Sequence, residues 1–245
     1  MSEPQNRCAA TPPESSPETD SPLASSGQLL VVKAGHWDSC SGQLQRFARH
    51  QLNAAWQPVG ATIEVSLGRR GLAWGLGRHR PAGDGPDKRE GDGRAPAGIF
   101  ALSELFGYAS PDSAFAGAAK LPYRCATHQL KCIDDPASAH YNQFVELDQI
   151  PHPDWTSHED MRRDDERYAV GAVIAHNQPQ PVPGAGSCIF LHVWQAAGVP
   201  TAGCTAASPA DIAAICVWLD GAAQPLLIQL PEAEYARFRA AWALP

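Results

Sequence analysis

His192 and Cys204, two residues that can serve as a base and a nucleophile, stand twelve positions apart in the chain. The segment 188–194 alternates between two sets of residues, so as a strand it would bury Ile189, Leu191 and Val193 on one face. The opposite face would carry Cys188, Phe190, His192 and Trp194. A strand holds a base rigidly enough to meet a thiol within hydrogen-bond range, and a protonated histidine beside the thiol favours the thiolate. Taken alone, the pair is better explained by an inert buried thiol and a hydrogen-bonded core histidine.

The residues around Cys204 fit a nucleophile that follows a turn. Gly198 and Pro200 indicate a loop that brings the chain back toward the strand. Gly203 permits a close backbone approach, and a capped helix is expected a few residues later. We therefore expect the amides of Gly203 and Cys204 to form an oxyanion hole, with Thr201 in a supporting role.

Motifs over much of the chain match one known pattern. His192 is followed, after a loop, by Thr-Ala-Gly-Cys at 201–204, and residues 88–100 read Lys-Arg-Glu-Gly-Asp-Gly-Arg-Ala-Pro-Ala-Gly-Ile-Phe. Residues 132–136, 141–142 and 155–177 complete the set. Together these motifs resemble the catalytic domain of the L,D-transpeptidases, the YkuD-like family, in which a strand-borne histidine precedes Ser/Thr-x-Gly-Cys. The resemblance covers roughly residues 28–230.

This resemblance implies a cysteine transpeptidase that acts on peptidoglycan stem peptides without a metal or organic cofactor. The Cys204 thiolate would attack the carbonyl of the third, L-centre residue, expel the terminal D-residue and form a thioester, with His192 as the base. An amine from another stem would then give a cross-link, whereas water would give L,D-carboxypeptidase trimming. The resemblance also places residues 84–94 around the substrate cleft.

Two features depart from the family pattern. The spacing from His192 to Cys204 is short, and residues 205–207, Thr-Ala-Ala, stand where many members carry an arginine that meets the substrate carboxylate. These departures keep a second interpretation open, a non-catalytic peptidoglycan-binding module with a degenerate site. The family location is the periplasm or cell wall, yet residues 1–27 contain no apolar signal segment. We interpret the start of the sequence as truncated or mis-assigned, and a cytosolic thiol hydrolase is the third interpretation.

Three further residues are candidates for the same cleft. His176 and Asn177 close a strand predicted over 168–177 and are expected to line the substrate or to stabilise the hairpin. His176 is also the reserve base, should His192 point away. Trp194 is grouped with them as a substrate-lining residue.

Cysteine spacing leaves several arrangements open. The seven cysteines are an odd number, so at least one is free or intermolecular in an oxidising compartment. Cys125, His128 and Cys132 have ligand-like spacing but lack a fourth ligand for structural zinc. We therefore expect a disulfide between Cys125 and Cys132, with two free thiols as the alternative.

Composition excludes several classes of protein. Only 18% of the residues are charged, and the 21 Gly and 22 Pro favour turns and extended segments over helix. The net charge of −7, without a Lys/Arg block, disfavours nucleic acid and anionic membrane surfaces as partners. No window approaches 18 consecutive apolar residues, so no membrane span is predicted.

The patterned region predicts a mainly β protein, a β-sandwich of the L,D-transpeptidase type with a few short helices. Residues 1–27 are predicted to be a disordered Pro/Ser-rich leader, and 28–245 a single domain. Ser208, Pro209 and Asp211 predict the start of a helix, a second helix is expected over 232–242, and His158 with 160–167 is expected to form a solvated helical turn. Strands are expected at 28–33, 41–56, 61–67, 71–76, 98–105, 129–133, 144–147, 168–177 and 188–194.

Overall fold

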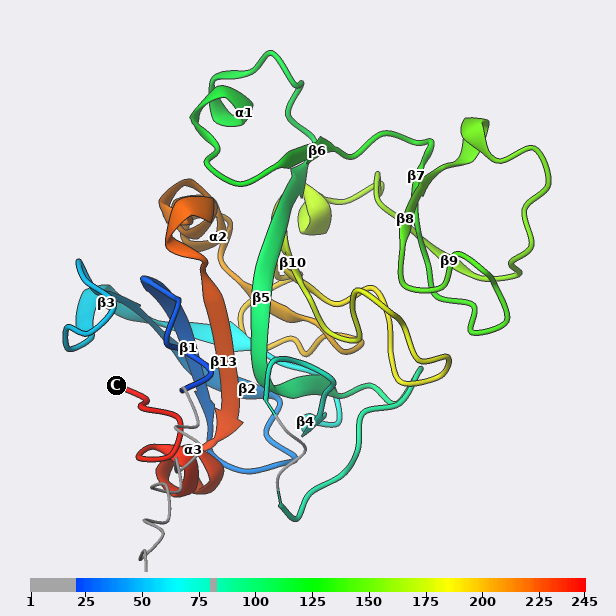
Figure 1. Ribbon diagram of the computed structural model, residues 1–245. Coiled ribbons are helices and arrows are strands. Elements are labelled where there is room, and N and C mark those ends of the chain that lie inside the picture. The colour runs from blue at the N-terminus through cyan, green and yellow to red at the C-terminus, as the bar shows by residue number, and fades with distance from the viewer. Residues whose placement is uncertain (1–20, 80–82) are drawn as a thin grey trace, which may run out of the picture.

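The structure, a computed structural model, describes residues 21–79 and 83–245 (Figure 1). Within these ranges the chain is mainly β, as predicted. The strands are β1 (Gln28–Ala34), β2 (Ser41–Ala48), β3 (Gln57–Ser66), β4 (Leu72–Trp74), β5 (Ala95–Gly107), β6 (Tyr123–Cys125), β7 (Leu130–Ile133), β8 (Phe144–Glu146), β9 (His158–Asp160), β10 (Val170–Ile174), β11 (Phe190–Val193), β12 (Thr205–Ala207) and β13 (Leu226–Pro231). The α-helices are α1 (Ala114–Ala118), α2 (Pro209–Trp218) and α3 (Glu232–Phe238), and the 3-10 turns are η1 (Leu147–Gln149), η2 (Glu166–Tyr168) and η3 (Gly221–Ala223).

The main sheet closes on itself. Its strands follow the order β10-β11-β12-β3-β2-β1-β13-β5-β4, and β10, at one end of the path, also pairs with β5, the strand next to the other end. The predicted sandwich is therefore not confirmed, because the strands form a closed barrel rather than two separate sheets. Alternation along a strand predicts a buried face but not whether the next sheet is separate or continuous, which explains the difference.

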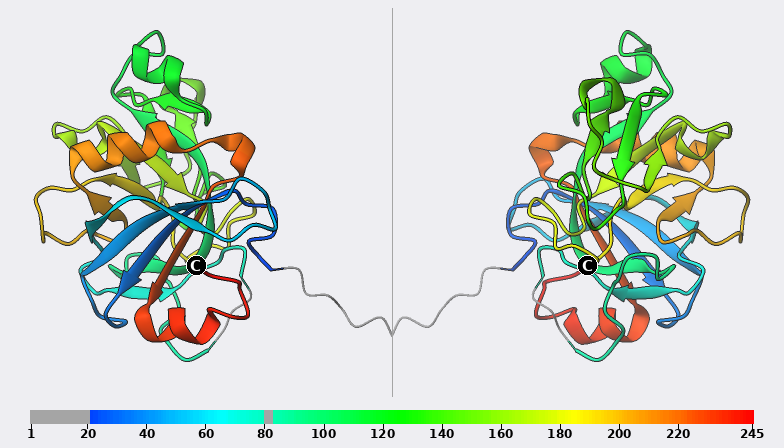
Figure 2. Two further views of the ribbon diagram at one scale, coloured as in Figure 1. Left: turned by 90° about the vertical axis from the view of Figure 1, so that its left-hand side faces the viewer. Right: turned by 90° about the vertical axis from the view of Figure 1, so that its right-hand side faces the viewer.

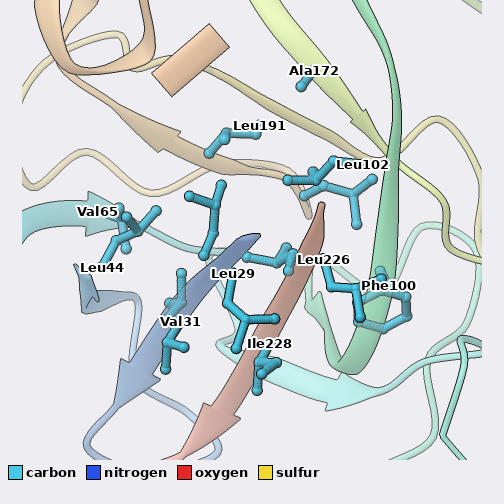
Figure 3. Packing of buried hydrophobic residues seen from close by; sticks show 14 of the residues in the cluster. Leu29, Val31, Leu44, Val65, Phe100, Leu102, Ala172, Leu191, Leu226 and Ile228 are labelled. Atoms are coloured by element: carbon cyan, nitrogen blue, oxygen red, sulfur yellow. The ribbon is translucent and has the colours of Figure 1, made fainter. Parts of the chain in front are cut away.

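Buried apolar side chains from all sides of this barrel pack into one large cluster (Figure 3). Leu29 of β1, Phe100 of β5, Leu191 of β11 and Leu226 of β13 are all less than 1% exposed. Removal of such side chains from water is the dominant favourable contribution to folding. The barrel is consequently a rigid frame for whatever its strands present on their outer faces.

One buried polar bond crosses the barrel. The Thr205 hydroxyl of β12 donates to Gln229 Oε1 of β13 at 2.7 Å, although β3, β2 and β1 lie between these strands in the sheet. Thr205 therefore points inward. Alternation then turns Cys204, the residue before it, toward the outside of the barrel.

A small second sheet, the cap, lies beside the barrel and consists of β8, β7 and β9 (Figure 1). A disulfide joins Cys132 of β7 to Cys188, two residues before β11, with a Cα–Cα distance of 5.9 Å. The predicted Cys125–Cys132 disulfide is thus wrong, and Cys125 is free. Spacing along the chain favoured the near neighbour, whereas the cap brings Cys132 to a partner 56 positions away.

The predicted helix starts hold. Ser208 caps α2, accepting from the Asp211 amide at 3.1 Å, with Pro at the first turn. Ile212, Ile215 and Cys216 of α2 are buried in the large cluster, and the helix packs on β10, β11 and β12. Figure 2 gives two side views, in which α2 and α3 lie against different parts of the barrel.

The expected solvated helical turn near 158 is wrong at its start, because 158–160 is strand β9 of the cap.

Residues 21–27 correct the predicted leader. Leu23 is 1% exposed, and the Arg49 guanidinium donates to the carbonyls of Leu23, Ala24 and Ser26. The low apolar content of 1–27 predicted disorder for the whole segment, because composition does not show that Leu23 packs into the fold. Residues 1–20 lie outside the described residues. Among the described helices, none combines the length and the apolar character needed to span a membrane.

Candidate functional site

Strands β11 and β12 bring His192 and Cys204 to one face. They run parallel, with Leu191 beside Thr205 and His192 beside Ala206. Leu191 belongs to the barrel cluster, so His192, the next residue along the strand, faces outward, as Cys204 does. Extension of the register by one residue places Cys204 beside Phe190, whose amide donates to Cys204 Sγ at 3.3 Å. The strand alternation predicted from the sequence is confirmed.

The loop before Cys204 is held by backbone bonds to the turn that follows β3. The Thr201 amide donates to the Leu67 carbonyl at 2.8 Å, and the Arg69 amide donates to the Thr201 carbonyl at 2.9 Å. The Thr201 hydroxyl donates to the Cys204 carbonyl at 2.6 Å and accepts from the Gly203 amide at 3.1 Å. Thr201 therefore holds the turn that precedes Cys204.

The same bond limits the predicted oxyanion hole. The Gly203 amide is already engaged by the Thr201 hydroxyl, so it is not free to meet an oxyanion in this arrangement. A Cβ at Gly203 would lie 3.1 Å from the Arg94 carbonyl oxygen, a tight contact, and its φ of +156° also favours glycine here. The Cys204 amide is the remaining member of the predicted pair.

The His192 ring is oriented by the main chain. Its Nδ1 lies 2.8 Å from the Val193 carbonyl oxygen, and since a carbonyl can only accept, Nδ1 carries the hydrogen. Neutral imidazole then has a lone pair on Nε2, the atom a base needs. Burial lowers the pKa of His192 to about 4, an effect to which the charges of Arg167 and Arg163 add. At neutral pH the ring is therefore uncharged and able to accept a proton.

The Cys204 thiol is also uncharged at neutral pH. Burial raises its pKa to about 12, although the Phe190 amide and the charges of Lys88 and Arg163 act in the opposite direction. The thiol donates to the Cys188 carbonyl at 3.7 Å, and among the described residues it shares no hydrogen bond with His192. The expected thiolate–imidazolium pair is thus not the resting state, because burial penalises both charges.

Cys204 and His192 open onto a single cavity of about 370 Å³, which Gly203, Thr201 and Trp194 also line. Its polar wall mixes both signs of charge. The cationic residues are Arg69, Lys88, Arg163 and Arg167, and the acidic residues are Glu90, Asp134 and Glu159. Such a cavity suits a ligand with charged groups rather than an apolar one.

One side of the cavity comes from the loop after β4. Lys88 is 8% exposed and its Nζ pairs with Asp92 Oδ1 at 2.7 Å. Glu90 Oε2 accepts from the Tyr141 hydroxyl at 2.5 Å and from the Ser187 hydroxyl at 2.6 Å. The charged stretch 84–94 is therefore partly built into the wall of this cavity rather than wholly solvated.

The other side comes from the cap and the segment after it, which the sequence analysis missed. Glu159 lies on β9, and burial raises the pKa of its carboxyl. Arg163 pairs with this carboxylate at 3.5 Å and with Asp165 at 3.3 Å. The dense charges of 158–167 were the available signal, but their position depends on long-range pairing of β9 with β7.

His176 and Asn177 do not join the site. The Leu76 amide donates to His176 Nδ1 at 3.1 Å, and His176 Nε2 therefore donates to the Ala185 carbonyl at 2.9 Å. The Asn177 side-chain amide donates to the carbonyls of Val182 and Gly186. Both residues stabilise the segment between β10 and β11, the structural alternative, and neither lines the cavity of Cys204.

No group of three or more His, Cys, Asp or Glu side chains suited to a metal ion occurs in residues 21–79 and 83–245. Comparison of the chain with protein-family models, curated proteins and solved structures gives no match. The geometry thus defines a buried cysteine–histidine site on a β-barrel, and the family remains a matter of motif resemblance.

Proposed function

We propose that this chain is a cysteine acyltransferase of the L,D-transpeptidase type, acting on peptidoglycan stem peptides. The observation that carries the proposal is the shared outward face of His192 and Cys204 on adjacent parallel strands, at one cavity. The motifs at 88–100 and 201–204 add the family resemblance, and residues of both motifs line that cavity. The finer assignment of the barrel to the L,D-transpeptidase catalytic fold belongs to the same proposal.

The first half of the reaction forms a thioester. Rotation about the Cα–Cβ bond of Cys204 turns its S–H from the Cys188 carbonyl toward His192 Nε2, which accepts the proton as sulfur attacks the carbonyl of the third stem residue. The carbon–nitrogen bond to the terminal D-residue then breaks, and the proton on His192 passes to the departing amine. Because both groups are neutral at rest, charge separation occurs only during attack.

The second half consumes the thioester. His192 removes a proton from the acceptor, which is an amine of a second stem or a water molecule. The acceptor attacks the thioester carbonyl, the carbon–sulfur bond breaks, and the proton returns to Cys204. An amine acceptor gives a cross-link, and water gives a trimmed stem.

The cavity charges suit a peptide with free carboxylates and amines. Residues 205–207 lack the family's arginine, but Arg69 lines the cavity and makes no ion pair among the described residues. Its guanidinium offers the bidentate donors that a carboxylate needs. The Cys204 amide is the candidate donor for the oxyanion.

Intact-protein mass spectrometry after incubation with a carbapenem tests the proposal, since this class acylates enzymes of the family. We expect one adduct on the wild type and on Cys216→Ala, and none on Cys204→Ala. Release of the terminal D-amino acid from a disaccharide tetrapeptide should show the same dependence. A folded wild type that forms no adduct and releases no amino acid would overturn the proposal.

A non-catalytic peptidoglycan-binding module is the second candidate. It is favoured by the raised pKa of the Cys204 thiol and by the engaged Gly203 amide. Equilibrium binding of a stem peptide to wild type and to Cys204→Ala separates the two. Equal binding without any adduct would support the module.

A further inference from the structure

The His192 ring is held partly by the main chain. Its Nδ1 donates to the Val193 carbonyl, and the Arg167 backbone also interacts with the ring. No carboxylate bonds to His192 among the described residues. Because catalysis depends on close alignment of Nε2, a side chain packed against the ring would add to this alignment.

Tyr168, at the end of η2, lies against that ring. The two ring centroids are 5.2 Å apart and the planes meet at 81°, an edge-to-face contact. Tyr168 is 6% exposed and lines the same cavity as His192 and Cys204. It is also in edge-to-face contact with Phe106 and Phe190, so its own ring is held on several sides.

The polar end of Tyr168 connects it to the far wall of the cavity. Its hydroxyl lies 3.5 Å from Glu159 Oε2, and the guanidinium carbon of Arg163 lies 5.2 Å from the ring centroid. Tyr168 thus fills the space between His192 and the cap.

We propose that Tyr168 is a positioning residue, which holds the His192 ring so that Nε2 faces Cys204. The inference rests on the proposed function for its catalytic consequence, but the ring contact itself does not. His192 shares its surroundings with the titratable groups of Tyr168, Glu159 and Cys204 and with the charges of Arg163 and Arg167. A change in the charge of any of these groups would also shift the titration of His192.

Three variants separate the role of the ring from general packing. Tyr168→Phe keeps the ring, Tyr168→Leu removes it, and Phe144→Leu removes an aromatic residue of the same cluster that stacks on Phe190 and does not contact His192. If Tyr168→Leu does not fold, Tyr168→Met restores most of the volume without a ring. Thermal unfolding of each variant reports folding independently.

The readouts are the rate of carbapenem acylation and the pKa of His192, measured by NMR and assigned with His192→Gln. Loss of the ring should slow acylation roughly ten- to hundredfold and move the pKa of His192 up from about 4 toward 6.5, since water then reaches the imidazole. Tyr168→Phe and Phe144→Leu should change the acylation rate by no more than about threefold and the pKa of His192 by no more than about 0.5, which is within the scatter of such effects.

The two possible failures are distinguishable. An unchanged acylation rate and an unchanged pKa of His192 in the ringless variant would overturn the positioning role. A wild type without any carbapenem adduct would contradict the proposed function instead, while the NMR titration would still decide whether Tyr168 holds the ring.

Discussion

Cys204 and Cys216 are both buried thiols whose pKa burial raises to about 12, yet their surroundings differ. Cys216 lies on α2 within the large apolar cluster, and burial is the one cause of its raised pKa. Cys204 faces a cavity that it shares with His192, and the Phe190 amide donates to its sulfur. The two thiols therefore differ in access and in the presence of a neighbouring base, and not in their resting pKa.

The largest expected difference between the two thiols is their rate of alkylation in the native protein. Iodoacetamide can reach Cys204 through the cavity, whereas Cys216 becomes accessible only when the fold opens. We expect Cys204 to react roughly 10³-fold faster or more, given typical opening free energies. Timed labelling followed by peptide mass spectrometry measures both rates, and equal rates would contradict the distinction.

Removal of the base should affect one thiol only. His192→Gln should lower the acylation rate of Cys204 by about 10²- to 10⁴-fold, the usual contribution of a general base. His176→Gln is the matched control, because His176 is also buried, has a pKa lowered to about 4 and does not line the cavity. Acylation kinetics of the folded variants check this, and an equal loss in both variants would point to a general packing effect.

Removal of the disulfide between Cys132 and Cys188 should affect Cys204 and Cys216 differently. Replacement of the disulfide in Cys132→Ala/Cys188→Ala should lower the free energy of unfolding by about 4 kcal/mol, the loop-closure value for a sequence separation of 56. Cys204 donates to the Cys188 carbonyl, so its alkylation rate should change directly, whereas that of Cys216 should rise only as far as the lower free energy of unfolding makes opening more frequent. Denaturant titration measures the stability, and timed labelling measures the alkylation rates. Unchanged labelling of Cys204 would show that the disulfide to the cap does not affect the surroundings of this thiol.

Alkaline pH should lower the free energy of unfolding through both thiols to a similar extent. Their pKa lies near 12 in the folded chain against an ordinary 9.0, so the folded state holds more protons between these values. Stability is therefore full below about pH 9 and falls as the pH rises toward 12, by up to about 1.4 kcal/mol per pH unit for each thiol. Cys204→Ala and Cys216→Ala should each remove the contribution of one thiol to the pH dependence of the free energy of unfolding. Denaturant titration at several pH values measures this.

Local sequence patterns predicted the inner part of the site well. Alternation over 188–194 placed His192 outward, and Ser208 with Pro209 marked the start of α2. Strand β13 was missed because 226–231 is buried throughout, so apolar residues stand on both faces with Gln229 between them and no alternation reveals the strand. Short runs of this kind are ambiguous until the partner strands are known.

The outer wall of the site could not be predicted from local patterns. Glu159 and Tyr168 reach the cavity because β9 pairs with β7 and because the cap is bonded to the barrel through Cys188. Each of these contacts joins residues far apart in sequence. Disulfide connectivity in particular is not determined by spacing, which is why the near pair Cys125 and Cys132 misled.

The pairing of β1 with β13 has a consequence for biosynthesis. Leu29 lies beside Leu226 in parallel register, so the barrel cannot close until nearly all of the strands have left the ribosome. Until then β1 has β2 but lacks its second neighbour, and one edge of a very apolar strand stays open to other chains. Non-local pairing of this kind also predicts slow folding. Nascent chains of this protein should therefore depend on protection of that edge until β13 emerges.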